Sequence, residues 1–268
     1  MSEKTAEFEK KIASKINIGD KLPQDVKKLS SLGVQGGAKV TKVSHVGSSG
    51  EKTDIEINFD KGPSLKISVK MKGADFFGNW YSHKRIINDF NGDIFSKLTK
   101  VCTEWANEWI DDPHASFFVG VSISFGRRGG KTWRKFTDIF KDDDINIIVK
   151  GANDRSANCL LAGNYIPNDL EDLIDRLEPL TEDVIKRISD NFKIIFRPIN
   201  PMTEGSNRSK CIYTQFVPFK KQTELTTISS IKELKEYGTF CEVECNSINH
   251  NTLIKKLKDE FNIQINVK

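Results

Sequence analysis

The chain has 268 residues, a formal net charge of +4 at pH 7 and 37% hydrophobic residues, which is enough apolar material for one large domain or two small ones. No run approaches the roughly 20 apolar residues of a membrane span, and the polar N-terminus "MSEKTAEFEKK" is unlike a signal peptide. Five scattered cysteines suit reduced thiols better than a disulfide framework. We therefore expect a cytoplasmic globular protein with no membrane partner.

The N-terminal part of the chain shows both helical and strand periodicity. Phe8, Ile12 and Ile16 recur at helical spacing and predict a first helix. Three runs that alternate like strands follow, separated by turn residues, and they predict an antiparallel meander. These runs cover residues 38–47, 53–59 and 64–71.

The rest of the chain continues the alternation of helices and strands. After the meander we predict a helix, a strand, a short helix and a strand, over residues 93–109, 116–126, 133–140 and 145–151. A helical stretch interrupted by Pro179, two strand-like runs and a closing helix follow, over residues 168–191, 192–199, 211–219 and 251–261. The pattern predicts an α/β fold with a mixed sheet flanked by helices over residues 1–150, and a C-terminal α+β extension over residues 151–268.

The second and third strands carry charge where a core would be expected. Asp54 and Glu56 share one face of the second strand, and Ser68 and Lys70 share one face of the third. In an antiparallel pair such residues come within about 5 Å of one another. Two close carboxylates repel unless a cation compensates, and Mg²⁺ prefers carboxylates together with retained water. With a lysine beside them, this predicts metal-assisted phosphodiester hydrolysis; the alternative is a solvated sheet face that carries cross-strand ion pairs.

This order of elements resembles the core of the PD-(D/E)XK nuclease superfamily, which includes many type II restriction endonucleases. The matching residues are Asp54 in "KTD" at the start of the second strand, and Ser68 and Lys70 in "ISVK" at the end of the third. The resemblance implies a restriction-endonuclease-like fold in which Asp54 and the main-chain carbonyl of Val69 ligate Mg²⁺ while Lys70 attends the nucleophilic water.

The chain departs from that pattern at Ser68, where most of the superfamily has Asp or Glu. Another acid must then supply the second carboxylate. We favour Glu56, because it shares a strand face with Asp54. The other candidates come from the first helix or from the segment after the third strand: Glu7, Glu9, Asp75, Asp89 and Asp93.

Three basic stretches are candidates for contacts with DNA phosphates or bases. The contacts we expect from them are His83, Lys84 and Arg85; Arg127, Arg128, Lys131, Arg134 and Lys135 in "GRRGGKTWRK"; and Asn207, Arg208 and Lys210 in a hairpin loop, "EGSNRSK". The second stretch misses the spacing of a nucleotide-binding P-loop, since Phe125 stands where the first glycine belongs.

Together these features predict a Mg²⁺-dependent endodeoxyribonuclease of the restriction type that acts on double-stranded DNA, by analogy as a homodimer. One alternative is a DNA-binding protein whose nuclease site has decayed at Ser68. Another is a repair or phage nuclease that recognises DNA structure rather than sequence.

Overall fold

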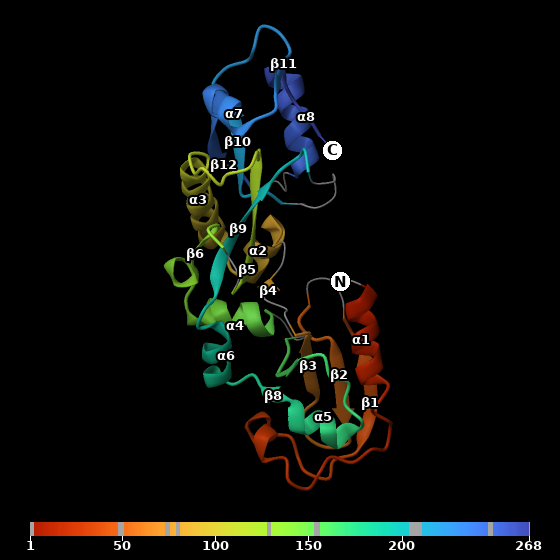
Figure 1. Cartoon of the computed structure of the whole chain (residues 1–268). Coiled ribbons are helices and arrows are strands. Elements are labelled where there is room, and N and C mark those ends of the chain that lie inside the picture. Colours follow the sequence, from red (N-terminus) through yellow and green to blue (C-terminus); the bar gives the residue numbers. More distant parts are fainter. Residues whose placement is uncertain are drawn as a thin grey trace. The chain divides into compact units, whose positions relative to one another are not determined.

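The computed structural model describes residues 3–47, 51–72, 76–78, 81–127, 130–152, 156–203, 211–245 and 249–267. It divides the chain into two compact units, each assembled from two separate stretches of sequence (Figure 1). Unit 1 comprises residues 1–75 and 142–191, and unit 2 comprises residues 76–141 and 192–268. Within the described residues, no helix combines the length and the apolar content that crossing a bilayer requires.

This division differs from the predicted boundary at residue 150. Strand β7 (Cys159–Ala162) lies beyond that boundary, yet it pairs in parallel with β3 (Leu65–Lys70). Strand β9 (Lys193–Ile199) pairs along its whole length with β5 (Gly120–Gly126), which lies before the boundary. Because strands from both sides of residue 150 share hydrogen-bonded sheets, neither sheet is confined to one side.

Unit 1 contains a five-stranded mixed sheet in the order β1-β2-β3-β7-β8. Its other strands are β1 (Val40–His45), β2 (Ile55–Phe59) and β8 (Glu178–Pro179). The antiparallel pairs β1-β2 and β2-β3 confirm the predicted meander, and the parallel pair β3-β7 makes the sheet mixed. The register sets His45 opposite Ile55 and Ile55 opposite Ile67. The last residues of β1 and β3 therefore lie at the same end of the sheet as the first residue of β2.

One face of this sheet forms the core of unit 1. Helix α1 (Glu3–Ala13) runs along β1 and β2 (Figure 1) and contributes Phe8 and Ile12 to a buried cluster. The strands contribute their alternate apolar residues to the same cluster: Ile55, Ile57, Leu65, Ile67, Val69, Cys159 and Leu161. The unit's other helices are η1 (Lys27–Leu32), α4 (Asp142–Lys150), α5 (Leu170–Arg176) and α6 (Glu182–Ser189).

Two predicted elements have a different conformation. All but the last residue of the run at 145–151, predicted as a strand, lies in helix α4, whose first turn carries Asp142, Asp143 and Asp144. Negative charge at a helix N-terminus is favourable, and a short apolar run fits helix and strand equally well. The predicted helix at 133–140 begins instead as strand β6 (Trp133–Lys135) and continues as a single 3₁₀ turn, η2 (Phe136–Asp138).

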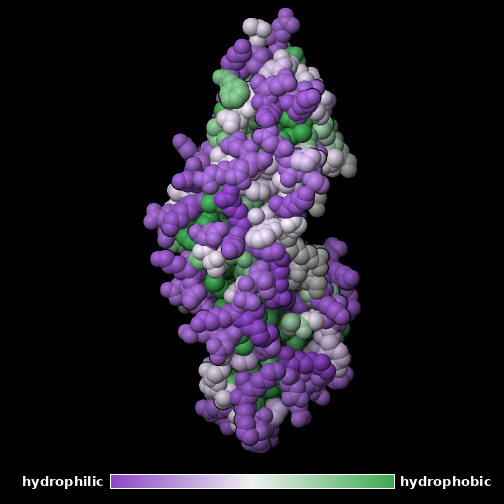
Figure 2. Space-filling view, turned by 60° about the vertical axis from the view of Figure 1, so that its left-hand side comes forward, coloured by the Kyte–Doolittle hydropathy of each residue, from purple (hydrophilic) through white to green (hydrophobic). Residues whose placement is uncertain are grey.

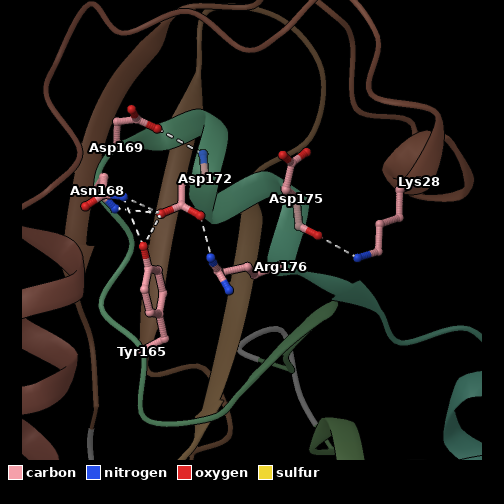
Figure 3. A network of polar contacts seen from close by, with 7 residues as sticks. All are labelled: Lys28, Tyr165, Asn168, Asp169, Asp172, Asp175 and Arg176. Atoms are coloured by element: carbon pink, nitrogen blue, oxygen red, sulfur yellow. Dashed lines mark hydrogen bonds and ion pairs between the residues drawn. The ribbon is translucent and has the colours of Figure 1, made fainter.

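A polar network holds helix α5 in place (Figure 3). Asp172 accepts hydrogen bonds from the hydroxyl of Tyr165, from the backbone and side-chain amides of Asn168 and from Arg176, whose guanidinium also lies 3.7 Å from the centre of the Tyr165 ring. At the end of the helix, Lys28 of η1 donates to the main-chain carbonyl of Asp175. These contacts fix the segment that follows β7, the parallel neighbour of β3.

Unit 2 is built on a second sheet in the order β12-β10-β5-β9-β6, with β4 also paired to β5. Its remaining strands are β4 (Phe76–Gly78), β10 (Thr214–Pro218) and β12 (Gly238–Glu242), and a separate parallel pair is formed by β11 (Thr226–Ile228) and β13 (Ile263–Ile265). Its helices are α2 (His83–Asp89), α3 (Gly92–Trp109), α7 (Ile231–Tyr237) and α8 (His250–Phe261). The chain is therefore of the mixed α/β class, as predicted.

The surface seen in Figure 2 is dominated by hydrophilic side chains, and hydrophobic ones appear there in small separate patches. This agrees with the mean hydropathy of −0.45. The apolar side chains that the periodicity assigned to cores, such as Ile55 and Leu98, are indeed buried.

Candidate active site

Asp54 directly precedes β2, and hydrogen bonds hold it firmly at that end of the unit 1 sheet. Its backbone N–H donates to the carbonyl of Ile67, and its own carbonyl accepts from Val46 and Gly47. The side chain, 9% exposed, accepts the backbone N–H of Val69 at 2.7 Å through Oδ2. A carboxylate that accepts a backbone N–H of a strand is fixed in direction.

Ser68 and Lys70 meet this carboxylate from β3, as the sequence predicted. The Lys70 ammonium donates to Ser68 Oγ at 2.9 Å and to the main-chain carbonyl of Val69 at 3.2 Å, and it lies 3.8 Å from Oδ2 of Asp54. Ser68 Oγ is 3.5 Å from the same oxygen, which is long for a hydroxyl hydrogen bond. The Lys70 side chain remains 22% exposed, so the amine is accessible to a small solute.

A second carboxylate approaches from helix α1. The Glu9 side chain is 1% exposed, and its Oε2 lies 2.8 Å from Nε2 of His45 at the end of β1. Burial raises the pKa of Glu9 above its ordinary value, and the negative charge of Asp54 raises it further. The hydrogen bond with His45 and the positive charge of Lys70 act in the opposite direction. The backbone contacts agree with these effects, because Val46, the residue after His45, donates its N–H to the carbonyl of Asp54 at 2.9 Å.

Glu56, the acid favoured from the sequence, lies elsewhere on the sheet. It pairs across the ladders with Lys66 and with Ser44, and no hydrogen bond or ion pair joins it to Asp54 or Lys70 in the described part of the chain. Two strand residues place it about 7 Å from Asp54 along β2. The preference for Glu56 is therefore not supported by its position, because a shared strand face is not enough to bring two side chains to one point.

The other acids considered as metal ligands have other partners, belong to unit 2 or are not described. Glu7 is exposed and ion-paired with Lys11, whereas Asp89 pairs with Arg85 in unit 2 and Asp93 lies in the first turn of α3. Asp75 lies outside the described residues. Among the described candidates of unit 1, Glu9 lies beside Asp54, because it bonds to His45 and the next residue, Val46, donates to the carbonyl of Asp54.

The sequence held a signal for Glu9 that its charge obscured. Glu9 precedes Ile12 by three residues and Ile16 by seven, so it lies on the apolar stripe of the first helix. An acid on a buried helix face is costly unless it is paired, which marks it as a candidate functional residue. His45 carried no comparable signal, because its nearness to Glu9 arises only when α1 packs on β1.

In each of these two carboxylates, one oxygen is available to bind a cation. All hydrogen bonds from described residues to Asp54 and Glu9 side chains use Oδ2 and Oε2, which leaves Oδ1 and Oε1 without a protein donor there. No group of three or more His, Cys, Asp or Glu side chains in the described ranges is arranged to hold a metal. Two carboxylates with the Val69 carbonyl would suit Mg²⁺, which binds to few protein ligands and keeps several waters.

The expected DNA contact at His83 has a structural role instead. The ring is fully buried in unit 2, where its Nε2 donates to the carbonyl of Ile212 at 2.8 Å and its edges pack against Phe95 and Tyr213. Burial lowers the pKa of His83, which favours the neutral imidazole. A buried neutral ring cannot reach a phosphate.

Several of the expected cationic contacts are already engaged in unit 2. Arg85 pairs with Asp89 and lies over the ring of Tyr81. Arg134 lies 3.3 Å from a carboxylate oxygen of Glu108. Lys131 lies beside the ring of His114, and Lys84, Arg127 and Lys135 are exposed.

The remaining expected contacts fall outside the described residues. These are Arg128, Asn207, Arg208 and Lys210. The loop that carries the last three does not join neighbouring strands as a hairpin would, because β5 lies between β9 and β10 in the sheet.

A cavity of about 250 Å³ lies between α4 and α6 in unit 1, apart from the Asp54 site. Its lining includes Asp142, Asp143, Glu182 and Lys186. Ser189, which also lines it, donates its hydroxyl to the carbonyl of Ile185 within its own helix. None of Asp54, Ser68, Lys70 and Glu9 lines this cavity.

No protein-family model matches this chain, and no curated protein matches it significantly. Its function must therefore be argued from the geometry of the site.

Proposed function

We propose that the chain is a Mg²⁺-dependent endodeoxyribonuclease with a restriction-endonuclease-like unit 1, and that it hydrolyses phosphodiester bonds of double-stranded DNA. The observation that carries the proposal is the meeting of Asp54 and Lys70 at the end of the mixed sheet where β2 begins, with Glu9 bonded beside them to His45, which lies opposite the first residue of β2. Burying two acids and an amine together lowers the stability of the fold. A bound cation would offset the charge of the acids, and the three residues together would then act on a phosphate.

Each residue has a distinct role in this proposal. Asp54 and Glu9 would hold the ion through their second oxygens, and the Val69 carbonyl would complete the protein ligands. Mg²⁺ bound there would supply positive charge for the developing negative charge of the phosphodiester and make a water molecule more acidic. Lys70, held by Ser68, would orient that water and accept or return its proton, a role that arginine could not fill because it stays protonated.

The charge of the two units supports a polyanionic partner. Unit 2 contains 22 Lys and Arg against 15 Asp and Glu, a formal excess of seven positive charges, whereas unit 1 contains 19 against 22. A basic unit suits binding to the phosphate backbone, and a palindromic DNA site would favour a homodimer.

A plasmid assay tests the proposal directly. Supercoiled DNA should be nicked or linearised in the presence of Mg²⁺ and left intact with EDTA, and Asp54→Asn should abolish cleavage while the protein stays folded. Discrete fragments would indicate sequence recognition, whereas a smear would favour the nuclease that recognises DNA structure. Tight DNA binding without cleavage in any divalent metal would replace the nuclease by a binding protein, in agreement with the serine at position 68.

Cleavage and binding should also respond to salt. The logarithm of the DNA affinity should fall with the logarithm of salt concentration by about 0.9 for each phosphate contact. A flat response would contradict both the nuclease and the DNA-binding proposals.

A further inference from the structure

We infer that His45 is a positioning residue for the site: it fixes the carboxylate of Glu9 in the orientation that presents Oε1 to the metal ion. This inference rests on the proposed function and adds to it a residue that neither touches the substrate nor belongs to the Asp-Ser-Lys set read from the sequence.

The inference starts from how differently the two carboxylates are held. Asp54 is fixed by the backbone N–H of Val69, which no side-chain substitution removes. Glu9 is fixed by a side chain: within the described residues, its hydrogen bond to Nε2 of His45 at 2.8 Å is the one that its carboxylate makes. Glutamate has one more rotatable bond than aspartate, so without that partner it has more orientations to lose on binding an ion.

The direction of the hydrogen bond follows from the chemistry of the pair. An ionised carboxylate can only accept, so Nε2 of His45 carries the proton and donates it to Oε2. This leaves Oε1 as the atom that can face a cation, as Oδ1 does in Asp54. Outer partners of this kind fix the orientation of metal ligands in many sites, and their loss typically costs 10- to 100-fold in metal affinity or activity.

The position of His45 also fits an indirect role. Its side chain is 21% exposed, compared with 1% for Glu9, so the histidine reaches from solvent to a carboxylate that is itself buried. It lies on β1, opposite Ile55 and therefore one position from Asp54 in the neighbouring strand. The same packing of α1 on β1 that buries Glu9 thus supplies the donor that an ionised Glu9 needs.

The test compares three substitutions in the full-length protein. His45→Leu removes the donor, His45→Gln keeps an amide N–H at about the position of Nε2, and His114→Leu is the matched control at an exposed histidine of unit 2. Mn²⁺ binding without DNA is measured by the electron paramagnetic resonance signal of the free ion. Thermal unfolding checks that each variant is folded, and His45→Asn, polar but too short, replaces the leucine variant if that one does not fold.

We expect His45→Leu to weaken Mn²⁺ binding by about 10- to 100-fold, and His45→Gln to restore it to within a few-fold of wild type. The Mg²⁺ concentration for half-maximal cleavage should rise by the same factor, while the rate at saturating metal changes little. Wild-type affinity in His45→Leu, or equal losses in the leucine and glutamine variants, would overturn the positioning role while leaving the nuclease intact. A wild-type protein that binds no Mn²⁺ and cuts no DNA would overturn the proposed function and this inference with it.

Discussion

Replacing Lys70 by methionine would separate catalysis from folding at this site. The change keeps an unbranched side chain that is one atom shorter, but removes an ammonium that donates two hydrogen bonds and lies 3.8 Å from Asp54. Hydrogen bonds to charged groups contribute about 1.5–3 kcal/mol each when buried, but at 22% exposure water replaces part of this. We expect a loss of about 1–3 kcal/mol, against a total stability of about 5–15 kcal/mol, so the protein stays folded.

The effect of Lys70→Met on the reaction should be much larger than its effect on the fold. A lysine that orients or deprotonates the attacking water contributes at least about 100-fold, which corresponds to about 2.7 kcal/mol in the barrier. Single-turnover cleavage of plasmid DNA at saturating Mg²⁺ measures the rate, and thermal unfolding measures the stability.

Lys66 provides the matched control for Lys70→Met, because it lies on the same face of β3 and faces Glu56 across the ladder. Lys66→Met should cut within a few-fold of the wild-type rate. The reasoning is refuted if Lys70→Met also cuts within a few-fold of wild type, or if both variants lose the same factor.

Three further predictions follow from burial and packing. Because burial raises the pKa of Glu9 above 4.5, the stability that this group contributes is present at low pH and is lost as the pH rises through the folded-state value. In EDTA, the melting temperature of Glu9→Gln minus that of wild type should therefore increase from about pH 5 to about pH 8. A difference that decreases with pH would contradict this. A Cβ on Gly238 would lie 2.3 Å from the carbonyl oxygen of Val217, so Gly238→Ala should destabilise unit 2 by about 1–3 kcal/mol. Urea unfolding followed by tryptophan fluorescence measures this, since all four tryptophans lie in that unit. An unchanged unfolding midpoint would count against the packing around Gly238. Burial raises the pKa of Cys159 to about 12, whereas Cys245 is exposed. A thiol reagent should therefore modify Cys245 in the native protein and Cys159 only after unfolding. The reverse order of modification would be inconsistent with the fold.

Local periodicity was sufficient to predict most of the long elements. The strand pattern around Ile55 and Ile67 predicted the meander, and the helical periodicity over residues 93–109 predicted α3. The run ending at Gly151 was predicted wrongly because seven mostly apolar residues fit either period. The partners of strands were not predictable, since the pairing of β3 with β7 joins residues about 90 positions apart through backbone hydrogen bonds that leave no mark in the sequence.

The candidate site was predictable where it lies within one local motif. Asp54, Ser68 and Lys70 belong to adjacent strands of a hairpin, and a strand face with charge in place of core identified them. Glu9 was only one of several possible acids, and His45 was not recognised, because both reach the site through the packing of a helix on a sheet. His83 shows the opposite error: its basic neighbours suggested exposure, but the ring belongs to the core.

The interleaving of the two units affects when the chain can fold during its synthesis. The strand that carries Lys70 acquires its parallel neighbour only after residues 159–162 have left the ribosome, by which time all of 76–141 has been made. Until then β3 exposes an unpaired edge, and such edges are prone to pairing with other chains. A fragment that stops at residue 150 would keep that edge open permanently, so we expect it to aggregate rather than behave as a minimal catalytic domain.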